Sequence, residues 1–395
     1  MIMRVLFITN LFPNAKEPSK GTYSYNIVKN LAKYCDIDVI APVPFAPGKR
    51  LLKGHKASEV SEKLPAMDML NGINVYYPRY MALPKAGFLH AFFLSLTLRK
   101  MIYQLQKKRN YTCINAHWVF PDGVAATKVA RELKIPIMIT ALGCDINLYA
   151  KFPLRRPQIE NAFHSCDKIS AVSEELRQKI ISMGVDPGKV LTIPNGVDVK
   201  LFNIEERDGA RKKLGLAHKN KLILYVGNLQ SEKGVQHLLE ATQRLMDFSD
   251  EDFKLFLVGD GPLRKELADW CSARGLGKNI QFQGAVPNEQ VPLWMNAADV
   301  LCLPSIREGH PNVIMEAKAC GTPVVGTDVG AVPEMVTPYS GLVVRRTDSS
   351  DLARSLLKAL NTKWDRQKIR ESVCKYSWAD CSLRYYQALK SISGD

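Results

Sequence analysis

The chain has 395 residues, of which 46% are hydrophobic and 24% are charged, enough for two well-buried domains and unlike a disordered sequence. No apolar segment is long enough to span a membrane, and the apolar run near the N-terminus is too short for a secretory signal. The nine cysteines form no CxxC pairs and no clusters with histidine, which argues against structural zinc. These features predict a globular cytoplasmic protein with reduced thiols.

The formal net charge of +15 is unevenly distributed. Residues 1–195 contain 27 lysines and arginines against 14 aspartates and glutamates, whereas residues 196–395 contain 27 against 25. No nucleic-acid motif with interleaved aromatic residues accompanies the basic half, so we expect no nucleic-acid partner. The charge favours an anionic membrane surface or a lipid-linked diphosphate.

The first half of the chain alternates short apolar runs with amphipathic segments, which is typical of a parallel α/β sheet. The first helix is expected over residues 22–34, and Gly21 directly before it leaves room for a phosphate or an acceptor. Strands are expected at residues 4–9, 37–41, 114–116, 135–140, 168–172 and 190–193.

A basic and apolar surface is predicted in the same half. Residues 45–70 form an irregular, lysine-rich stretch, and residues 88–109 form a helix with an apolar half and a basic end at Lys107, Lys108 and Arg109. Such a helix can rest on an anionic membrane, peripherally on its inner face. The alternative is that it packs on its sheet and leaves the basic end in water.

His117 follows the strand expected at residues 114–116. Strand ends in an open α/β sheet commonly carry the residues that contact ligands. A structural role for this histidine is the alternative.

The Pro-Asn-Gly turn within residues 193–198 marks the expected domain boundary. Beyond it the alternation restarts, and Lys233 lies on a loop from which its ammonium group can reach a diphosphate. The elements expected here are a helix at 235–248 and strands at 222–226, 253–258, 280–282 and 300–303.

The most informative stretch is residues 304–325, where a strand gives way to a loop and then to a helix that starts after Pro311. Proline near the first helical position gives up no hydrogen bond, so the backbone amides of Asn312 and Val313 point out of the helix start. The amides and the helix dipole together favour a phosphate or pyrophosphate.

Two carboxylates flank that helix start. Glu308 lies on the loop and Glu316 about one turn inside the helix. Each can accept hydrogen bonds from a pair of neighbouring hydroxyls, which suits a hexose at one end and a ribose at the other. The pattern predicts a nucleotide sugar as ligand, with two solvated glutamates as the alternative.

This stretch resembles the EX7E signature of the retaining glycosyltransferases of family 4, which have the GT-B fold of two Rossmann-like domains. The similarity spans nearly the whole chain, because several family motifs occur in the expected order. The matching residues are Glu308, Gly309, His310, Pro311, Asn312, Glu316, Ala317, Gly321, Thr322, Pro323, Val324 and Val325.

The resemblance assigns roles to residues in both halves. It implies that His117 touches the donor sugar near the reacting carbon and that the backbone at Val286 meets the base. Residues 140–145 are similar to the family's TxHGxD loop, in which Asp145 is kept and Leu142 replaces the histidine. The family's usual glycine loop is represented by Lys20 and Gly21.

One departure concerns the diphosphate. The family most often has an arginine where this chain has Asn228, which can form hydrogen bonds but cannot neutralise a phosphate. Lys233 and the amides of the helix would then carry more of the binding, helped by Arg307.

By resemblance, residues 1–195 with a returning helix at 376–395 form the acceptor domain, and residues 196–375 form the donor domain. The expected substrates are a UDP- or GDP-linked sugar and a glycan or lipid-linked acceptor, with no metal and no cofactor. The pattern is most similar to enzymes of cell-surface polysaccharide synthesis, such as teichuronic acid glycosyltransferases. Attack on the same face as the leaving diphosphate retains the configuration, and His117 and Glu308 are the expected catalytic residues.

Two other functions are consistent with parts of this pattern. A nucleotide-sugar 2-epimerase shares the architecture, although its catalytic groups would lie in other loops. A non-catalytic subunit that binds nucleotide sugars would fit the departures at Leu142 and Asn228.

Overall fold

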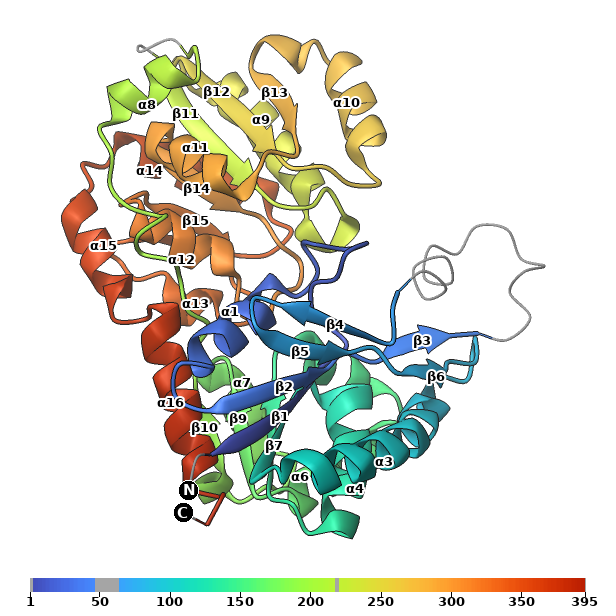
Figure 1. Ribbon diagram of the computed structural model, residues 1–395. Coiled ribbons are helices and arrows are strands. Elements are labelled where there is room, and N and C mark those ends of the chain that lie inside the picture. Colours follow the sequence, from blue (N-terminus) through green and yellow to red (C-terminus); the bar gives the residue numbers. More distant parts are fainter. Residues whose placement is uncertain (1–2, 47–63, 217–219, 395) are drawn as a thin grey trace. The chain divides into compact units, whose positions relative to one another are not determined.

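The computed structural model of the protein describes residues 3–46, 64–216 and 220–394 (Figure 1). The chain divides into two compact units. Unit 1 comprises Met1–Asn195 and Trp378–Asp395, and unit 2 comprises Gly196–Ser377. The chain therefore leaves unit 1 once and returns to it with its last helix.

Unit 1 is built on a sheet with the strand order β10-β9-β8-β7-β1-β2-β5-β4. Neighbouring strands are parallel except β4, which runs antiparallel to β5. The strands are β1 (Arg4–Ile8), β2 (Asp36–Ile40), β4 (Met67–Leu70), β5 (Ile73–Tyr76), β7 (Cys113–His117), β8 (Ile137–Ala141), β9 (Lys168–Ala171) and β10 (Val190–Thr192).

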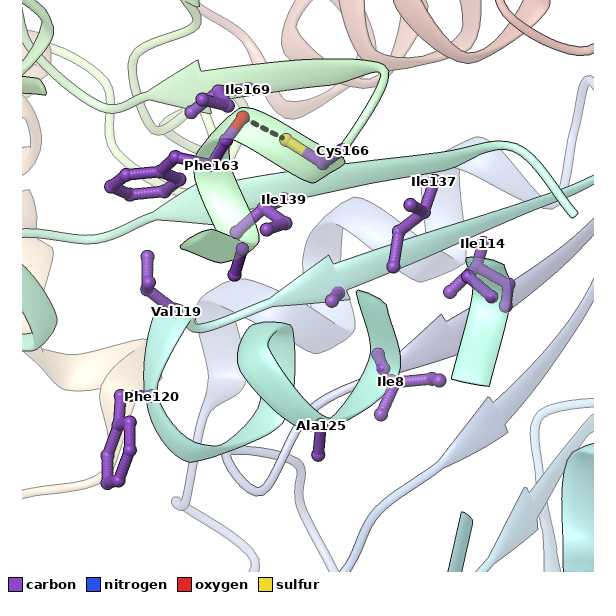
Figure 2. Close-up of a cluster of buried hydrophobic side chains, with 14 of the residues drawn as sticks. Ile8, Ile114, Val119, Phe120, Ala125, Ile137, Ile139, Phe163, Cys166 and Ile169 are labelled. Carbon is purple, nitrogen blue, oxygen red and sulfur yellow. Dashed lines mark hydrogen bonds between the residues drawn. The ribbon is translucent and has the colours of Figure 1, made fainter. Parts of the chain in front are cut away.

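Both faces of this sheet are buried, which explains why its central strands read as continuous apolar runs. In β1, Leu6 and Ile8 face one core, which holds α3, α4, α6 and α7, and Val5 and Phe7 face the other, which holds α1 and α16. Figure 2 shows part of the first core, to which Ile114, Val119, Ile137 and Ile139 all contribute. The helices of unit 1 are α1 (Thr22–Leu31), α3 (His90–Arg109), α4 (Val124–Leu133), α5 (Cys144–Asn147), α6 (Arg156–Ser165), α7 (Glu174–Ile181) and α16 (Trp378–Lys390).

The expectation of an irregular stretch over residues 45–70 is wrong at its end, because residues 67–70 form β4. β4 and β5 make a hairpin around Asn71 and Gly72, which both have positive φ angles, as a two-residue hairpin turn requires. Short strands β3 (Val43–Phe45) and β6 (Arg79–Met81) pair beside it. Residues 47–63 of the stretch lie outside the described part of the chain.

Unit 2 contains a parallel sheet with the order β13-β12-β11-β14-β15-β16. Its strands are β11 (Lys221–Val226), β12 (Phe253–Val258), β13 (Ile280–Gly284), β14 (Val300–Leu303), β15 (Val324–Thr327) and β16 (Gly341–Val344). Its helices are α8 (Arg207–Lys213), α9 (Val235–Phe248), α10 (Arg264–Ser272), α11 (Val291–Ala297), α12 (Asn312–Ala319), α13 (Val332–Met335), α14 (Ser349–Asn361) and α15 (Arg366–Cys374).

Helices α9, α10 and α14 cover one face of this sheet, and α8, α11, α12, α13 and α15 cover the other. The sequence-based expectation of a parallel α/β sheet is confirmed in both units. Within the residues described, no helix is long and apolar enough to cross a membrane.

Candidate functional site

The loop between β14 and α12 begins the candidate site. Pro311 has an extended backbone, with φ −72° and ψ 108°, and α12 starts at Asn312 without a side-chain cap. The prediction that a helix begins directly after Pro311 is confirmed. Its positive dipole end and amide groups give this loop the properties of an anion site.

Glu308 is nearly buried, with 9% of its surface exposed, and one of its oxygens receives two hydrogen bonds. Lys233 Nζ lies 2.8 Å from Oε1 of Glu308, and Ser305 Oγ donates to the same oxygen at 2.6 Å. A buried carboxylate is stabilised by such charge-assisted hydrogen bonds. Oε1 of Glu308 is therefore occupied by two donors.

Glu316 lies in the second turn of α12 and is only partly exposed. Burial raises the pKa of its carboxyl group from 4.5 to about 7. Among the residues that the structure describes, no side chain donates a hydrogen bond to it. Such a carboxyl group can accept hydroxyl hydrogen bonds from a ligand once it is ionised.

His310 precedes Pro311 in the same loop. Burial lowers the pKa of its imidazole to about 4, so the ring is neutral at physiological pH. Its Nδ1 atom is buried and has no hydrogen-bond partner in the described ranges. The ring therefore adds no positive charge to the anion site.

Lys233 approaches Glu308 because its own loop packs against the end of β14. Gly234 has φ +60°, and a Cβ atom there would lie 2.1 Å from the carbonyl oxygen of Pro304. Only glycine tolerates both the left-handed backbone and this approach. The contact fixes where Lys233, the preceding residue, enters the site.

The other charged and polar candidates near this edge are more exposed. Arg307 forms an ion pair with Glu232 at 3.0 Å, and both side chains are largely exposed. The side chain of Asn228 is exposed, and its carbonyl oxygen accepts a hydrogen bond from Tyr225 at 2.8 Å. Val286, which follows β13, is half-buried against the core of unit 2.

In unit 1, His117 is fully buried at the end of β7. Ser24 Oγ lies 3.0 Å from its Nδ1, while Nε2 has no hydrogen-bond partner within the described part of the chain. The rings of Tyr23 and Tyr385 lie 6.0 and 6.1 Å away, centroid to centroid. Burial lowers the pKa of His117 to about 3, so the imidazole is neutral.

Asp145 is also fully buried, and it binds backbone rather than solvent. Its carboxylate accepts hydrogen bonds from the amides of Val119, Leu142 and Gly143 at 2.8 to 3.1 Å. Burial raises the pKa of Asp145 to about 6, and these amides counteract the shift. Asp145 therefore joins the loops that follow β7 and β8.

Asp122 was not among the predicted site residues, although it lies on the loop that follows His117. It is fully buried, and its Oδ2 accepts a hydrogen bond from the amide of Asn10 at 2.8 Å. Oδ1 finds no partner among the residues described, and burial raises the pKa of the group to about 7. Its position after a strand end was the signal in the sequence that could have identified it.

Gly21 has φ +61° at the start of α1, and a Cβ atom there would lie 2.1 Å from the carbonyl oxygen of Leu11. Backbone packing alone therefore requires glycine here. Contact of Gly21 with a ligand stays a prediction.

The predicted residues thus fall into two groups, one in each unit. In unit 2, the chain brings Lys233 and Glu308 into contact and places Glu316 on the helix that follows. In unit 1, His117 and Asp145 lie at the ends of neighbouring strands. Over residues 3–46, 64–216 and 220–394, no cluster of three or more His, Cys, Asp or Glu could hold a metal ion.

Two family models match consecutive parts of the chain. Residues 20–201 match the model described as Glycosyltransferase Family 4, and residues 206–375 match the one described as Glycosyl transferases group 1. A protein of Bacillus subtilis (strain 168), named for teichuronic acid biosynthesis as the glycosyltransferase TuaC, is 32% identical over 93% of this chain and 90% of its own length. The N-acetyl-alpha-D-glucosaminyl L-malate synthase of Bacillus anthracis is 26% identical over 87% and 91%, respectively.

Solved structures resemble the chain over its whole length. The sucrose-phosphate synthase of Thermosynechococcus elongatus has a TM-score of 0.79 at 19% identity and covers 99% of each chain. Anabaena Alr3699/HepE, solved in complex with UDP, has a TM-score of 0.73 at 20% identity and covers 98% of this chain and 100% of its own. At these identities the likeness shows the fold, and the predicted GT-B architecture is confirmed.

Proposed function

The chain belongs to the family 4 glycosyltransferases, and from that premise we propose that it transfers a hexose-type sugar from a UDP- or GDP-linked donor with retention of configuration. The acceptor in this proposal is a glycan or a lipid-linked sugar of cell-surface polysaccharide synthesis. The name of the Bacillus subtilis relative supports that setting, and the UDP complex of HepE supports the donor class.

The observation that carries the proposal is the convergence of Lys233 and Glu308 at the start of α12. The ammonium group of Lys233 and the amides at Asn312 and Val313 together suit a diphosphate. In the proposal, Glu308 binds hydroxyls of the donor sugar and Glu316 binds those of the ribose. Asn228, His310, Pro311 and Arg307 border the same site, and the backbone at Val286 meets the base.

The chemical step follows from that placement. The acceptor hydroxyl attacks the anomeric carbon on the face from which the diphosphate leaves, so a new C–O bond forms as the bond to the phosphate oxygen breaks. The hydroxyl proton passes to the departing phosphate oxygen. The protein then contributes position and charge stabilisation, without a cofactor or metal in this proposal.

In unit 1, we assign Nε2 of His117 to the donor sugar near the reacting carbon. This role requires a neutral imidazole, and the pKa of His117, about 3, keeps the ring neutral. Ser24 orients the ring through Nδ1. Gly21 is assigned to donor binding, and Asp145 holds together the loops that follow β7 and β8.

An anionic membrane surface is the proposed location, through helix α3 on the cytoplasmic side. The outward face of α3 exposes Phe92, Leu96 and Tyr103, which are 47%, 47% and 51% exposed. Lys100 and Lys107 project from the same face, where Arg99 pairs with Glu132, and the helix sequence itself contains no acidic residue. Apolar side chains interleaved with cations are typical of helices that lie on anionic bilayers.

The proposed reaction is tested by incubating the purified protein with UDP- and GDP-sugars and a lipid-linked acceptor extract. We expect an acceptor-dependent product with the donor's anomeric configuration. Replacing Glu308→Gln or His117→Ala should lower turnover by roughly a hundredfold, as loss of a group that stabilises the transition state does. Conversion of the donor to an epimer without acceptor would contradict transfer.

A further inference from the structure

The hydroxyl group of Ser305 is fully buried next to Glu308, outside every residue that the sequence pattern selected. We propose that Ser305 is a positioning residue that orients the Glu308 carboxylate so that Oε2 faces the donor sugar. The inference rests on the proposed function, because it takes Glu308 as the group that binds the sugar. It adds a residue that affects binding of the sugar part of the donor but not of its nucleotide part.

The distribution of donors over the two oxygens of Glu308 is the main evidence. Ser305 Oγ and Lys233 Nζ both bond Oε1, at 2.6 and 2.8 Å. Within the part of the chain that is described, no group donates to Oε2. A carboxylate has about four acceptor positions, so two on Oε1 are occupied and those on Oε2 are available to hydroxyls.

Ser305 is itself held from the neighbouring strand. Thr327, the last residue of β15, donates its hydroxyl hydrogen bond to the carbonyl oxygen of Ser305 at 2.5 Å. Both residues are buried, with at most 2% of their surface exposed. This bond and the complete burial of Ser305 hold the residue beside Glu308.

The backbone of Glu308 is fixed independently of Ser305. A Cβ atom at Gly330 would lie 2.5 Å from the Glu308 carbonyl oxygen, so the loop after β15 packs tightly on it. Removing the Ser305 hydroxyl should therefore leave the loop in place and release only the carboxylate group. A change in sugar binding in a Ser305 variant can therefore be attributed to the orientation of the Glu308 carboxylate rather than to a displaced loop.

Lys233 cannot replace Ser305 in this role. Its side chain is 31% exposed, and its ammonium group has three donors that a diphosphate can share. When Lys233 also bonds a phosphate, Ser305 remains the buried donor that keeps Oε1 occupied. Ser305 therefore affects binding of the sugar, whereas Lys233 affects binding of the sugar and of the diphosphate.

The test compares binding of UDP and UDP-glucose, and of GDP and GDP-mannose, by calorimetry. For Ser305→Ala, we expect the affinity for the sugar conjugate to fall roughly tenfold, the effect of losing one charge-assisted hydrogen bond, while affinity for the free diphosphate stays within about twofold. Ser305→Thr, which keeps the hydroxyl, should restore sugar binding. Ser340→Ala is the matched control, because Ser340 is buried in the same unit and, among the described residues, its hydroxyl group bonds only Thr337.

Glu308→Gln in the same assay distinguishes a failure of the proposed function from a failure of the role of Ser305. If this variant keeps the wild-type ratio of the two affinities, or if the wild type binds neither pair, the proposed function is wrong and the inference falls with it. If Glu308→Gln loses sugar binding but Ser305→Ala keeps it, only the role of Ser305 is wrong. Equal weakening of both ligands in Ser305→Ala would also overturn that role.

Discussion

Lys233 Nζ and Glu308 Oε1 lie 2.8 Å apart, although the two residues are separated by 75 positions in the sequence. Lys233 follows β11 and Glu308 follows β14, and these strands are parallel neighbours in the sheet of unit 2. The carboxyl ends of parallel strands meet at one edge, which is where ligands bind in open α/β sheets. The ion pair therefore places a cation beside the carboxylate at the expected binding edge.

Removing that cation should weaken nucleotide binding. In Lys233→Ala, the diphosphate loses its ammonium partner, so we expect the affinity for UDP or GDP to fall at least about tenfold. Calorimetry measures the change, with Lys363→Ala as a control because Lys363 is exposed on another loop. Equal affinities of the wild type and Lys233→Ala would contradict a diphosphate at this position.

The loop that carries Lys233 should depend on Gly234. Gly234 and Gly275 have similar φ angles of +60° and +67°, but only Gly234 has a neighbour, Pro304 O, where a Cβ would be placed. Gly275→Ala should lower the free energy of unfolding by about 1 kcal/mol, the cost of left-handed backbone. Gly234→Ala should lower it by at least about 2 kcal/mol more, because the collision is with backbone. Urea unfolding of the two variants measures the difference. Equal losses in the free energy of unfolding would show that the close approach of Pro304 does not exclude a side chain at position 234.

Much of the fold was predictable because local pattern and tertiary environment agree. The apolar run at Phe253–Val258 and the amphipathic run at Val235–Phe248 form β12 and α9 with the predicted bounds. The hairpin of β4 and β5 was missed although Asn71 and Gly72 form a recognisable turn signal. Its strand β4 is largely exposed and lacks the apolar alternation that identifies a strand.

The candidate site was predictable in its positions but not in its contacts. The sequence indicates a helix start after Pro311, and the structure begins α12 there. The bonds from Ser305 and Lys233 to Glu308 depend on how β11, β14 and β15 lie side by side, which no single-sequence spacing specifies. Asp122 follows a strand end, but its bond to the amide of Asn10 joins residues 112 positions apart, and sequence spacing does not specify such a contact.

Glu316 should make stability depend on pH. Burial raises its pKa from 4.5 to about 7 in the folded protein. The free energy of unfolding is therefore lowered at every pH at which the Glu316 carboxyl group is ionised in the unfolded chain. Below pH 4.5 both states are protonated and the penalty is absent. It grows between pH 4.5 and 7 and is constant above.

We therefore expect Glu316→Gln to be more stable than the wild type at pH 8, by about 1–3 kcal/mol. The gain should shrink as the pH falls and vanish near pH 4.5. Denaturant unfolding at several pH values measures it, with the exposed Glu289→Gln as control. A gain that does not change with pH would mean that Glu316 is not the titrating group.

The membrane proposal predicts sedimentation of the protein with anionic phosphatidylglycerol vesicles and weaker binding to phosphatidylcholine vesicles or at high salt. Replacing Phe92, Leu96 and Tyr103 together by serine should lower binding roughly tenfold or more through lost apolar burial. Met246→Ser with Phe248→Ser is the control, because these side chains are 37% and 49% exposed on α9 in unit 2. Unchanged binding of the triple variant, or a monomer-to-dimer change at this face, would contradict a membrane role for α3.

A thermal-shift screen determines whether a nucleotide diphosphate sugar binds between Glu308 and Glu316. UDP, GDP, ADP and their common sugar conjugates are each added to the wild type and to Glu316→Ala. A ligand that binds only the folded state at a hundred times its Kd adds about 2.7 kcal/mol, which raises Tm by several degrees. We expect such a shift for one class of nucleotide in the wild type and its loss in Glu316→Ala. No shift with any nucleotide, or the same shift in both proteins, would contradict binding between Glu308 and Glu316.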